Sequence, residues 1–231
     1  MTSQPAPPNY KLWRNLGLLG LLGAFMVGVG EFMVHFDPTS SPASGDFSFF
    51  GGVSDSSFAT GHFLMVAFLP LYILGYLHFY LGMRSGGEKL ARAVFVLGVF
   101  AFMIGGIWAG SRAFLGSLEH LLNKPETSEI WNQVVVLYKF YLEILVQALR
   151  VLVLSISACF IAVVLRGNTF YPRWFAACAP IIPLLIIFLL FFTVPDIGKY
   201  LLPAAMNVTH TLVFALSLYS GSRHLRKTSS I

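Results

Sequence analysis

The sequence predicts an all-α membrane protein, a polytopic bundle of six transmembrane helices with both termini in the cytoplasm. Three observations predict this class. Hydrophobic residues make up 56% of the 231 residues and charged residues only 11%, whereas a soluble domain carries about 25% charged residues. Several apolar runs exceed the ~18 residues that signal a spanning helix. Basic residues gather in alternate connections, as they do in cytoplasmic loops of membrane proteins.

The six spans follow from apolar runs that are separated by charged or helix-breaking connections. We predict them at about 12–36, 57–82, 90–116, 134–165, 174–194 and 200–220. Residues 1–11 then form a cytoplasmic tail, residues 12–220 the transmembrane domain, and residues 221–231 a basic cytoplasmic tail.

The connections differ in charge between the two sides of the membrane. One side holds Lys11, Arg14, Arg84, Lys89, Arg92, Arg166, Arg173, Arg223, Arg226 and Lys227. The other side holds only Arg112, Lys124 and Lys199. This asymmetry predicts that the first side is cytoplasmic. It accounts for the net charge of +5, so no nucleic-acid partner is expected. We expect a multi-pass protein of the bacterial cytoplasmic membrane.

The first span carries small residues at helical spacing, among them Gly17, Gly20 and Gly23. Its apolar run is longer than a signal-peptide core, so we expect it to be retained. The third span has the same character at Gly106 and Gly110. Such glycine seams allow close helix contact. They predict packing within the chain, a homo-oligomer, or a membrane-protein partner.

The second span contains a stripe of aromatic residues, and the last two contain prolines. Tyr72, Tyr76 and Tyr80 share one helical face, which is typical of a packing seam or an aromatic belt; a ligand-lining stripe is the alternative. Pro180, Pro183 and Pro203 are expected to kink the fifth and sixth spans. A kink beside a polar residue would open space for a ligand.

The fourth span carries polar residues on one helical face. Lys139, Glu143, Gln147 and Arg150 recur at intervals of four, four and three, which places them together. In a membrane helix such a face is expected to turn inward. It predicts a structural ion-pair ladder or a functional site, in which Lys139 and Arg150 bind substrate and Glu143 moves protons.

Further ionisable residues are predicted in the outer half of the bilayer. At about 1.5 Å of rise per residue, Glu31 and His62 lie roughly 7–9 Å below the outer edge, and Glu143 and His210 roughly 11–15 Å below it. His35 lies nearer the surface. Ionisable residues at membrane depth are costly and commonly mark a functional site. Whether these side chains converge depends on the order of the helices.

Histidines supply a candidate metal centre. His35, His62 and His210, with Glu31 nearby, would suit Zn²⁺ with one position open for water. Strong zinc motifs such as His-Glu-x-x-His do not occur in the sequence, so hydrogen-bonded packing roles for these histidines are the alternative. A single haem b held between His62 and His210 is a further alternative.

Two functional classes follow from these groups. In the first, metal-activated water hydrolyses a lipid amide or ester while Glu31 or Glu143 moves protons. In the second, the same groups form a proton-coupled transporter of a small solute. A non-catalytic subunit of a larger complex is the third reading. Arg112 and Asn207 are expected to contact substrate, Arg112 through an anionic group, and membrane lipids are the expected partners.

Two stretches resemble a known group of proteins. Gly28-x-Gly30-Glu31 and the segment Pro70-Leu71-Tyr72-Ile73-Leu74-Gly75 resemble uncharacterised bacterial membrane proteins that have an acidic residue in helix one and Pro-Leu-Tyr-x-Leu-Gly in helix two. The resemblance implies no particular activity.

A looser similarity points to the alkaline ceramidases and adiponectin-type receptors. The similarity to these intramembrane zinc hydrolases implies three histidine ligands. The chain departs from them in having six predicted spans instead of seven. It also has Asn207-x-x-His210 where they carry a His-x-x-x-His, which puts the metal assignment in question.

Overall fold

The structure is a computed structural model, and it describes residues 9–37, 48–122 and 128–228. Every element in these ranges is helical. The α-helices are α1 (Tyr10–His35), α2 (Asp55–Phe68), α3 (Leu71–Met83), α4 (Glu88–Leu122), α5 (Ser128–Arg166), α6 (Ile181–Thr193), α7 (Pro195–Leu201) and α8 (Ala205–Thr228). The short 3-10 helices are η2 (Ser48–Gly52), η3 (Arg84–Gly86), η5 (Arg173–Cys178) and η6 (Leu202–Ala204). The prediction of an all-α bundle is confirmed.

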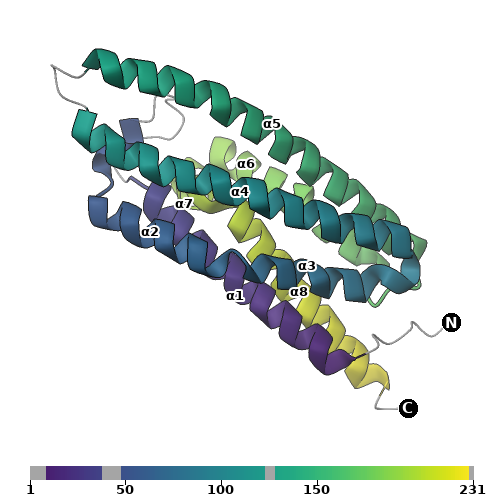
Figure 1. Ribbon diagram of the computed structural model, residues 1–231. Helices are drawn as coiled ribbons and strands as arrows, with labels where there is room; N and C mark the ends of the chain where they lie inside the picture. The colour runs from purple at the N-terminus through teal and green to yellow at the C-terminus, as the bar shows by residue number, and fades with distance from the viewer. Residues whose placement is uncertain (1–8, 38–47, 123–127, 229–231) are drawn as a thin grey trace.

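Five helical segments are long and apolar enough to cross a membrane: 10–35, 55–86, 88–121, 129–166 and 195–221. The start of α1, the α3–α4 connection and the end of α8 lie at one end of the bundle (Figure 1). We call this the basic end, because it holds Arg14, Arg84 and Arg166. Its orientation in a membrane stays a prediction. The predicted 1–11 tail lies mostly outside the described residues, and α8 continues into the predicted C-terminal tail.

The structure does not confirm six full spans. The predicted fifth span is replaced by η5 and by α6, which has 13 residues and is therefore about 20 Å long. A hydrocarbon core of about 30 Å needs roughly 20 helical residues. Pro180 lies between η5 and α6 and cannot donate a backbone hydrogen bond. Proline therefore shortens this span rather than kinking it.

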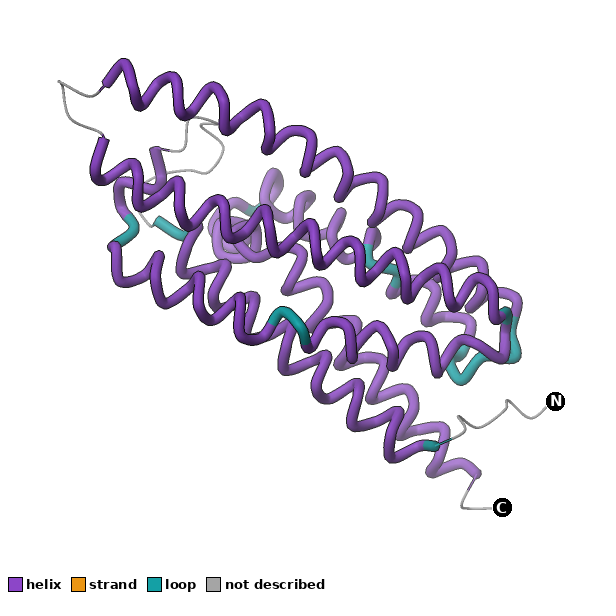
Figure 2. The backbone as a smooth tube through the Cα atoms, in the orientation of Figure 1, coloured by secondary structure: helices purple, strands orange, loops and turns teal. Residues whose placement is uncertain are grey.

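The second predicted span is a pair of helices. The α2 helix ends at Phe68 and α3 begins at Leu71, so the break falls at Leu69-Pro70, and Figure 2 shows it as a non-helical point. The cause is Pro70, which has no amide hydrogen and disturbs the preceding turn. The break turns Leu69 toward the interior space described below.

The glycine seam of α1 is used inside the chain. A Cβ added at Gly20 would lie 2.5 Å from the Cα of Gly75 in α3, and one at Gly30 would lie 2.6 Å from the carbonyl oxygen of Gly61 in α2. Only glycine permits such close backbone contact. The seam predicted in α4 contacts side chains instead of backbone: a Cβ at Gly106 would lie 2.5 Å from Cδ2 of Leu69, and one at Gly110 would lie 3.5 Å from Cε1 of His62. A partner bound through glycine seams stays a prediction.

The predicted inward stripe of α5 is wrong for most of its members. Lys139, Glu143 and Gln147 are exposed, and the side chains of Glu143 and Arg150 are both 62% exposed. The helix begins earlier than predicted, so Glu143 lies about 35 Å along α5 from Arg166, beyond a ~30 Å hydrocarbon core. If Arg166 marks the cytoplasmic edge of the bilayer, as the charge asymmetry predicts, this length does not agree with the depth predicted for Glu143. Charges in that region can be hydrated and need not turn inward.

In three helices the uncharged stretch ends at a similar distance from the basic end. Residues 15–30 of α1, 93–111 of α4 and 151–165 of α5 contain no charged residue. The next charged residues, Glu31, Arg112 and Arg150, lie about 24–30 Å along their helices from the last basic residue of the other end. That length matches the hydrocarbon core of a bilayer. We call these three residues the outer polar layer.

Candidate functional site

An interior cavity is lined by the outer polar layer and by apolar side chains. Its volume is about 630 Å³, and residues of α1, α2, α4, α5, α6 and α8 line it. The lining includes most of the sequence-predicted site residues: Glu31, His35, His62, Arg112, Arg150, Asn207 and His210. The sequence could not show whether these residues converge, because that depends on the order of the helices. In the structure they line the same cavity. Lys139 and Glu143 do not line the cavity.

A buried hydrogen-bond chain crosses the inner side of the cavity. The hydroxyl of Tyr72 in α3 donates to Oδ1 of Asn207 in α8, and Nδ2 of Asn207 donates to the carboxyl group of Glu31 in α1. All three side chains are buried. A buried carboxyl group without a partner is strongly destabilising, so Asn207 fixes both the place and the orientation of Glu31.

His210 lies next to these hydrogen-bonded residues, and both of its ring nitrogens have hydrogen-bond partners. Its Nδ1 is 2.8 Å from the carbonyl oxygen of Met206. A carbonyl only accepts, so Nδ1 carries the proton and Nε2 is the acceptor. The hydroxyl of Tyr76, 2.9 Å away, donates to Nε2. His210 therefore holds Tyr76 in the cavity wall as a hydrogen-bonded packing residue.

The predicted metal centre is not assembled. Within the described ranges, no three His, Cys, Asp or Glu side chains come together in a way that could hold a metal ion. His210 is occupied by Tyr76 and Met206, which gives a physical reason. The assignment of His35, His62 and His210 as three ligands of one metal therefore finds no support, and the His62–His210 haem pair loses the free nitrogen that it needs.

Aromatic side chains form the outer part of the cavity. The ring of His35 lies 5.4 Å from Trp108 and 6.4 Å from Phe50, centroid to centroid. The guanidinium of Arg112 lies 4.9 Å from the ring of Trp108 and 5.7 Å from that of Phe50. Cation–π contact of this kind orients Arg112. The arrangement directs the cation toward the cavity, where Arg112 is one of the lining residues.

Two polar atoms in this wall have no hydrogen-bond partner among the described residues. They are Nδ1 of His62 and Nε1 of Trp108, both of them buried. Both residues line the cavity. Buried polar groups are nearly always satisfied by protein, water or ligand. These two atoms therefore mark positions where a bound molecule would gain hydrogen bonds.

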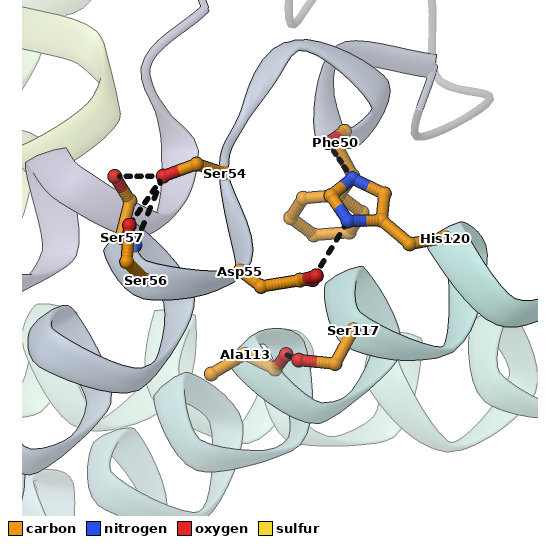
Figure 3. Close-up of polar contacts among 8 residues, drawn as sticks. All are labelled: Phe50, Ser54, Asp55, Ser56, Ser57, Ala113, Ser117 and His120. Carbon is orange, nitrogen blue, oxygen red and sulfur yellow. Dashed lines mark hydrogen bonds and ion pairs between the residues drawn. The ribbon is translucent and has the colours of Figure 1, made fainter.

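The outer end is closed by a polar clasp, shown in Figure 3. Nδ1 of His120 lies 2.7 Å from Oδ1 of Asp55, and Nε2 lies 3.2 Å from the carbonyl oxygen of Phe50. Ser54 caps α2 by accepting from the amide of Ser57. The clasp ties η2 to α4 and holds Phe50 over Arg112. Asp55 and His120 are distant in sequence, and no sequence pattern connected them.

His78 belongs to a separate network near the basic end, as its predicted position implies. Its Nδ1 donates to the carbonyl oxygen of Trp13 at 2.7 Å, and its Nε2 lies 2.6 Å from Oγ of Ser217. The ring stacks on Trp13 at 4.3 Å. Tyr171 joins the network, and burial raises the pKa of its hydroxyl. This network connects α1, α3 and α8 and does not reach the cavity.

Three aromatic residues at or beside the cavity were not among the candidate site residues taken from the sequence. Tyr72, Tyr76 and Trp108 each place a polar atom beside the cavity or its hydrogen-bond chain. The signal was present for the two tyrosines, whose four-residue spacing also fits a ligand-lining stripe. Nothing in the sequence distinguished Trp108 from the other tryptophans.

Comparison with known proteins gives a family without an activity. A family model described as a family of unknown function, DUF6796, matches residues 1–222. No similar curated protein and no similar solved structure is found. The match covers nearly the whole bundle and agrees with the resemblance to an uncharacterised family. The chain therefore belongs to the DUF6796 family of unknown function.

Proposed function

We propose that this membrane protein binds an amphipathic, lipid-like molecule in the cavity. The supporting observation is the composition of one cavity wall. Glu31, Arg112 and Arg150 lie at one height, and apolar residues such as Ile181 and Leu184 of α6 lie on the side nearer the basic end. The volume of about 630 Å³ falls in the range of small-molecule sites. A polar group at one end and an apolar chain at the other would match this wall.

Access from the bilayer supports a ligand that comes from the membrane. Leu154 of α5 and Phe188 of α6 both line the cavity, and they are 56% and 40% exposed. The cavity therefore reaches the surface between these two helices, on a side that would face lipid. With the basic end in the cytoplasm, as the charge asymmetry predicts, the polar layer would take its ligand from the outer leaflet.

Gly105 offers a direct test of binding. It lines the cavity, and a Cβ there would meet open space. We expect Gly105→Leu to fill the cavity without disturbing the fold and to lower the amount of co-purified lipid by about tenfold, a loss of about 1.4 kcal/mol in affinity. Mass spectrometry of the protein purified in mild detergent measures the lipid bound per chain.

A matched control for this test is Ile107→Phe, which enlarges a side chain of the same helix. Ile107 is 62% exposed and does not line the cavity, so this variant should retain as much lipid as the wild type. Equal retention by Gly105→Leu and Ile107→Phe would contradict the proposal, as would a wild-type protein that carries no specific lipid.

Two activities are compatible with ligand binding at this site, and in both of them Glu31 would transfer the proton. Hydrolysis of a lipid amide or ester would use Glu31 as a general base without the metal first considered; proton-coupled transport would use it as the proton carrier. A buried carboxyl group facing a cavity favours both. In lipid vesicles, the Glu31→Gln variant should still bind the lipid-like ligand but should lose one of two signals. The signal lost is release of a hydrolysis product if the protein is a hydrolase, or movement of the ligand together with protons if it is a transporter. Loss of neither signal would remove both activities.

A further inference from the structure

We infer that the cavity recognises the phosphate headgroup of an anionic lipid, held between Arg112 of α4 and Arg150 of α5. This inference deepens the proposed lipid binding and rests on it. The first argument is charge. Among the residues that line the cavity, Arg112 and Arg150 are cationic and Glu31 is the carboxylate. An anionic group would therefore be attracted to this part of the lining, where it would compete with Glu143 for Arg150.

The two arginines are held in ways that suit a ligand. The guanidinium carbon of Arg112 lies over the ring of Trp108, 4.9 Å from its centroid, and this cation–π contact orients the side chain beside the cavity that it lines. Arg150 pairs with Glu143 through Nη1 and Oε1 at 3.8 Å, with both side chains 62% exposed. An exposed pair at that distance contributes little. Arg150 can therefore exchange Glu143 for a stronger anionic partner.

Further hydrogen-bonding groups favour phosphate over carboxylate. Nδ1 of His62 and Nε1 of Trp108 are buried, line the same cavity and lack a hydrogen-bond partner among the described residues. Together with the two arginines, these groups come from α2, α4 and α5. A phosphate diester presents oxygens in several directions and accepts bonds from separate helices, whereas a carboxylate has two oxygens in one plane.

The apolar part of the cavity identifies a lipid rather than a soluble phosphate compound. Below the arginines the wall is formed by side chains such as Val153, Ile156 and Leu184, and the mouth between α5 and α6 is apolar as well. A phosphate with no hydrocarbon chain would leave that surface unfilled. The acyl chain is therefore expected to point from the arginines toward Pro180 at the basic side.

The experiment compares lipids in nanodiscs that contain the full chain. We expect wild-type protein to retain phosphatidylglycerol at least about tenfold better than diacylglycerol with the same chains, since charge-assisted hydrogen bonds are the strong ones. Arg112→Gln and Arg150→Gln should each reduce retention of phosphatidylglycerol about tenfold. Arg92→Gln in α4 and Arg166→Gln in α5, both near the basic end, should leave retention unchanged. Bound lipid per chain is measured by native mass spectrometry.

The possible outcomes separate this inference from lipid binding itself. If Gly105→Leu removes the lipid while both arginine variants retain it, the protein binds a lipid but the phosphate assignment is overturned. If inorganic phosphate at low millimolar concentration displaces phosphatidylglycerol, the site belongs to a soluble phosphate compound and the lipid assignment is overturned. If wild-type protein binds none of these lipids, the proposed function fails as well. Circular dichroism of each variant identifies any that has failed to fold.

Discussion

Gly20→Ala is expected to destabilise the folded protein by about 3 kcal/mol, the upper part of the range for overpacking a well-packed site. A Cβ at Gly20 would lie 2.5 Å from the Cα of Gly75, so the clash is with backbone and no side-chain rotation relieves it. The helices α1 and α3 would have to separate. Titration of the protein with SDS in mixed micelles, followed by circular dichroism, measures the free energy of unfolding.

The same substitution at Gly105 is the matched control. Both glycines lie inside long helices, and alanine is the better helix former by about 1 kcal/mol. Because a Cβ at Gly105 meets no atom within 4 Å, Gly105→Ala should be neutral or slightly stabilising. Equal unfolding free energies for the two variants would show that the contact between α1 and α3 is looser than described.

Asn207→Leu is expected to cost about 3–5 kcal/mol, the usual penalty for leaving a buried charged or polar partner unpaired. The change removes the donor to Glu31 and the acceptor of Tyr72 at once. The same unfolding titration measures the loss. A second variant, Glu31→Leu combined with Asn207→Leu, should recover much of it, because replacing both partners of a buried polar pair is far less costly than removing one.

Thr209→Val is the control for Asn207→Leu on the same helix. Thr209 is fully buried, and its hydroxyl has no hydrogen-bond partner among the described residues. Valine has nearly the same shape, so this variant should change the unfolding free energy by less than about 0.5 kcal/mol or raise it slightly. A large loss with Thr209→Val and a small one with Asn207→Leu would contradict the hydrogen-bond chain described here.

The sequence predicted the class of fold and named several of the residues that line the cavity, because both follow from composition and depth. Apolar runs identify helices, and the distances of Glu31, His62 and His210 from the ends of their spans placed all three in the outer half of the bilayer. Height alone does not decide which helices are neighbours. The sequence therefore left the convergence of these residues open, and the structure brings them together around a cavity that α1, α2, α4 and α8 help to line.

The failures have physical causes that a single sequence does not contain. Periodicity showed that Lys139, Glu143 and Gln147 share a face, but it could not show where α5 begins relative to the bilayer. In the structure α5 already begins at Ser128, and these three residues are exposed. In the same way, hydropathy counted residues 174–194 as one span, whereas the backbone restriction at Pro180 divides it into η5 and α6.

The hydrogen bond between Glu31 and Asn207 joins residues 176 positions apart, and this separation has a consequence for biosynthesis. The helix that carries Glu31 is translated before the helix that carries its partner. Throughout elongation the carboxyl group must be hydrated, protonated or shielded by the insertion machinery. A chain truncated before α8 would lack Asn207, and the carboxyl group of Glu31 in its first helix would lose this hydrogen-bond partner.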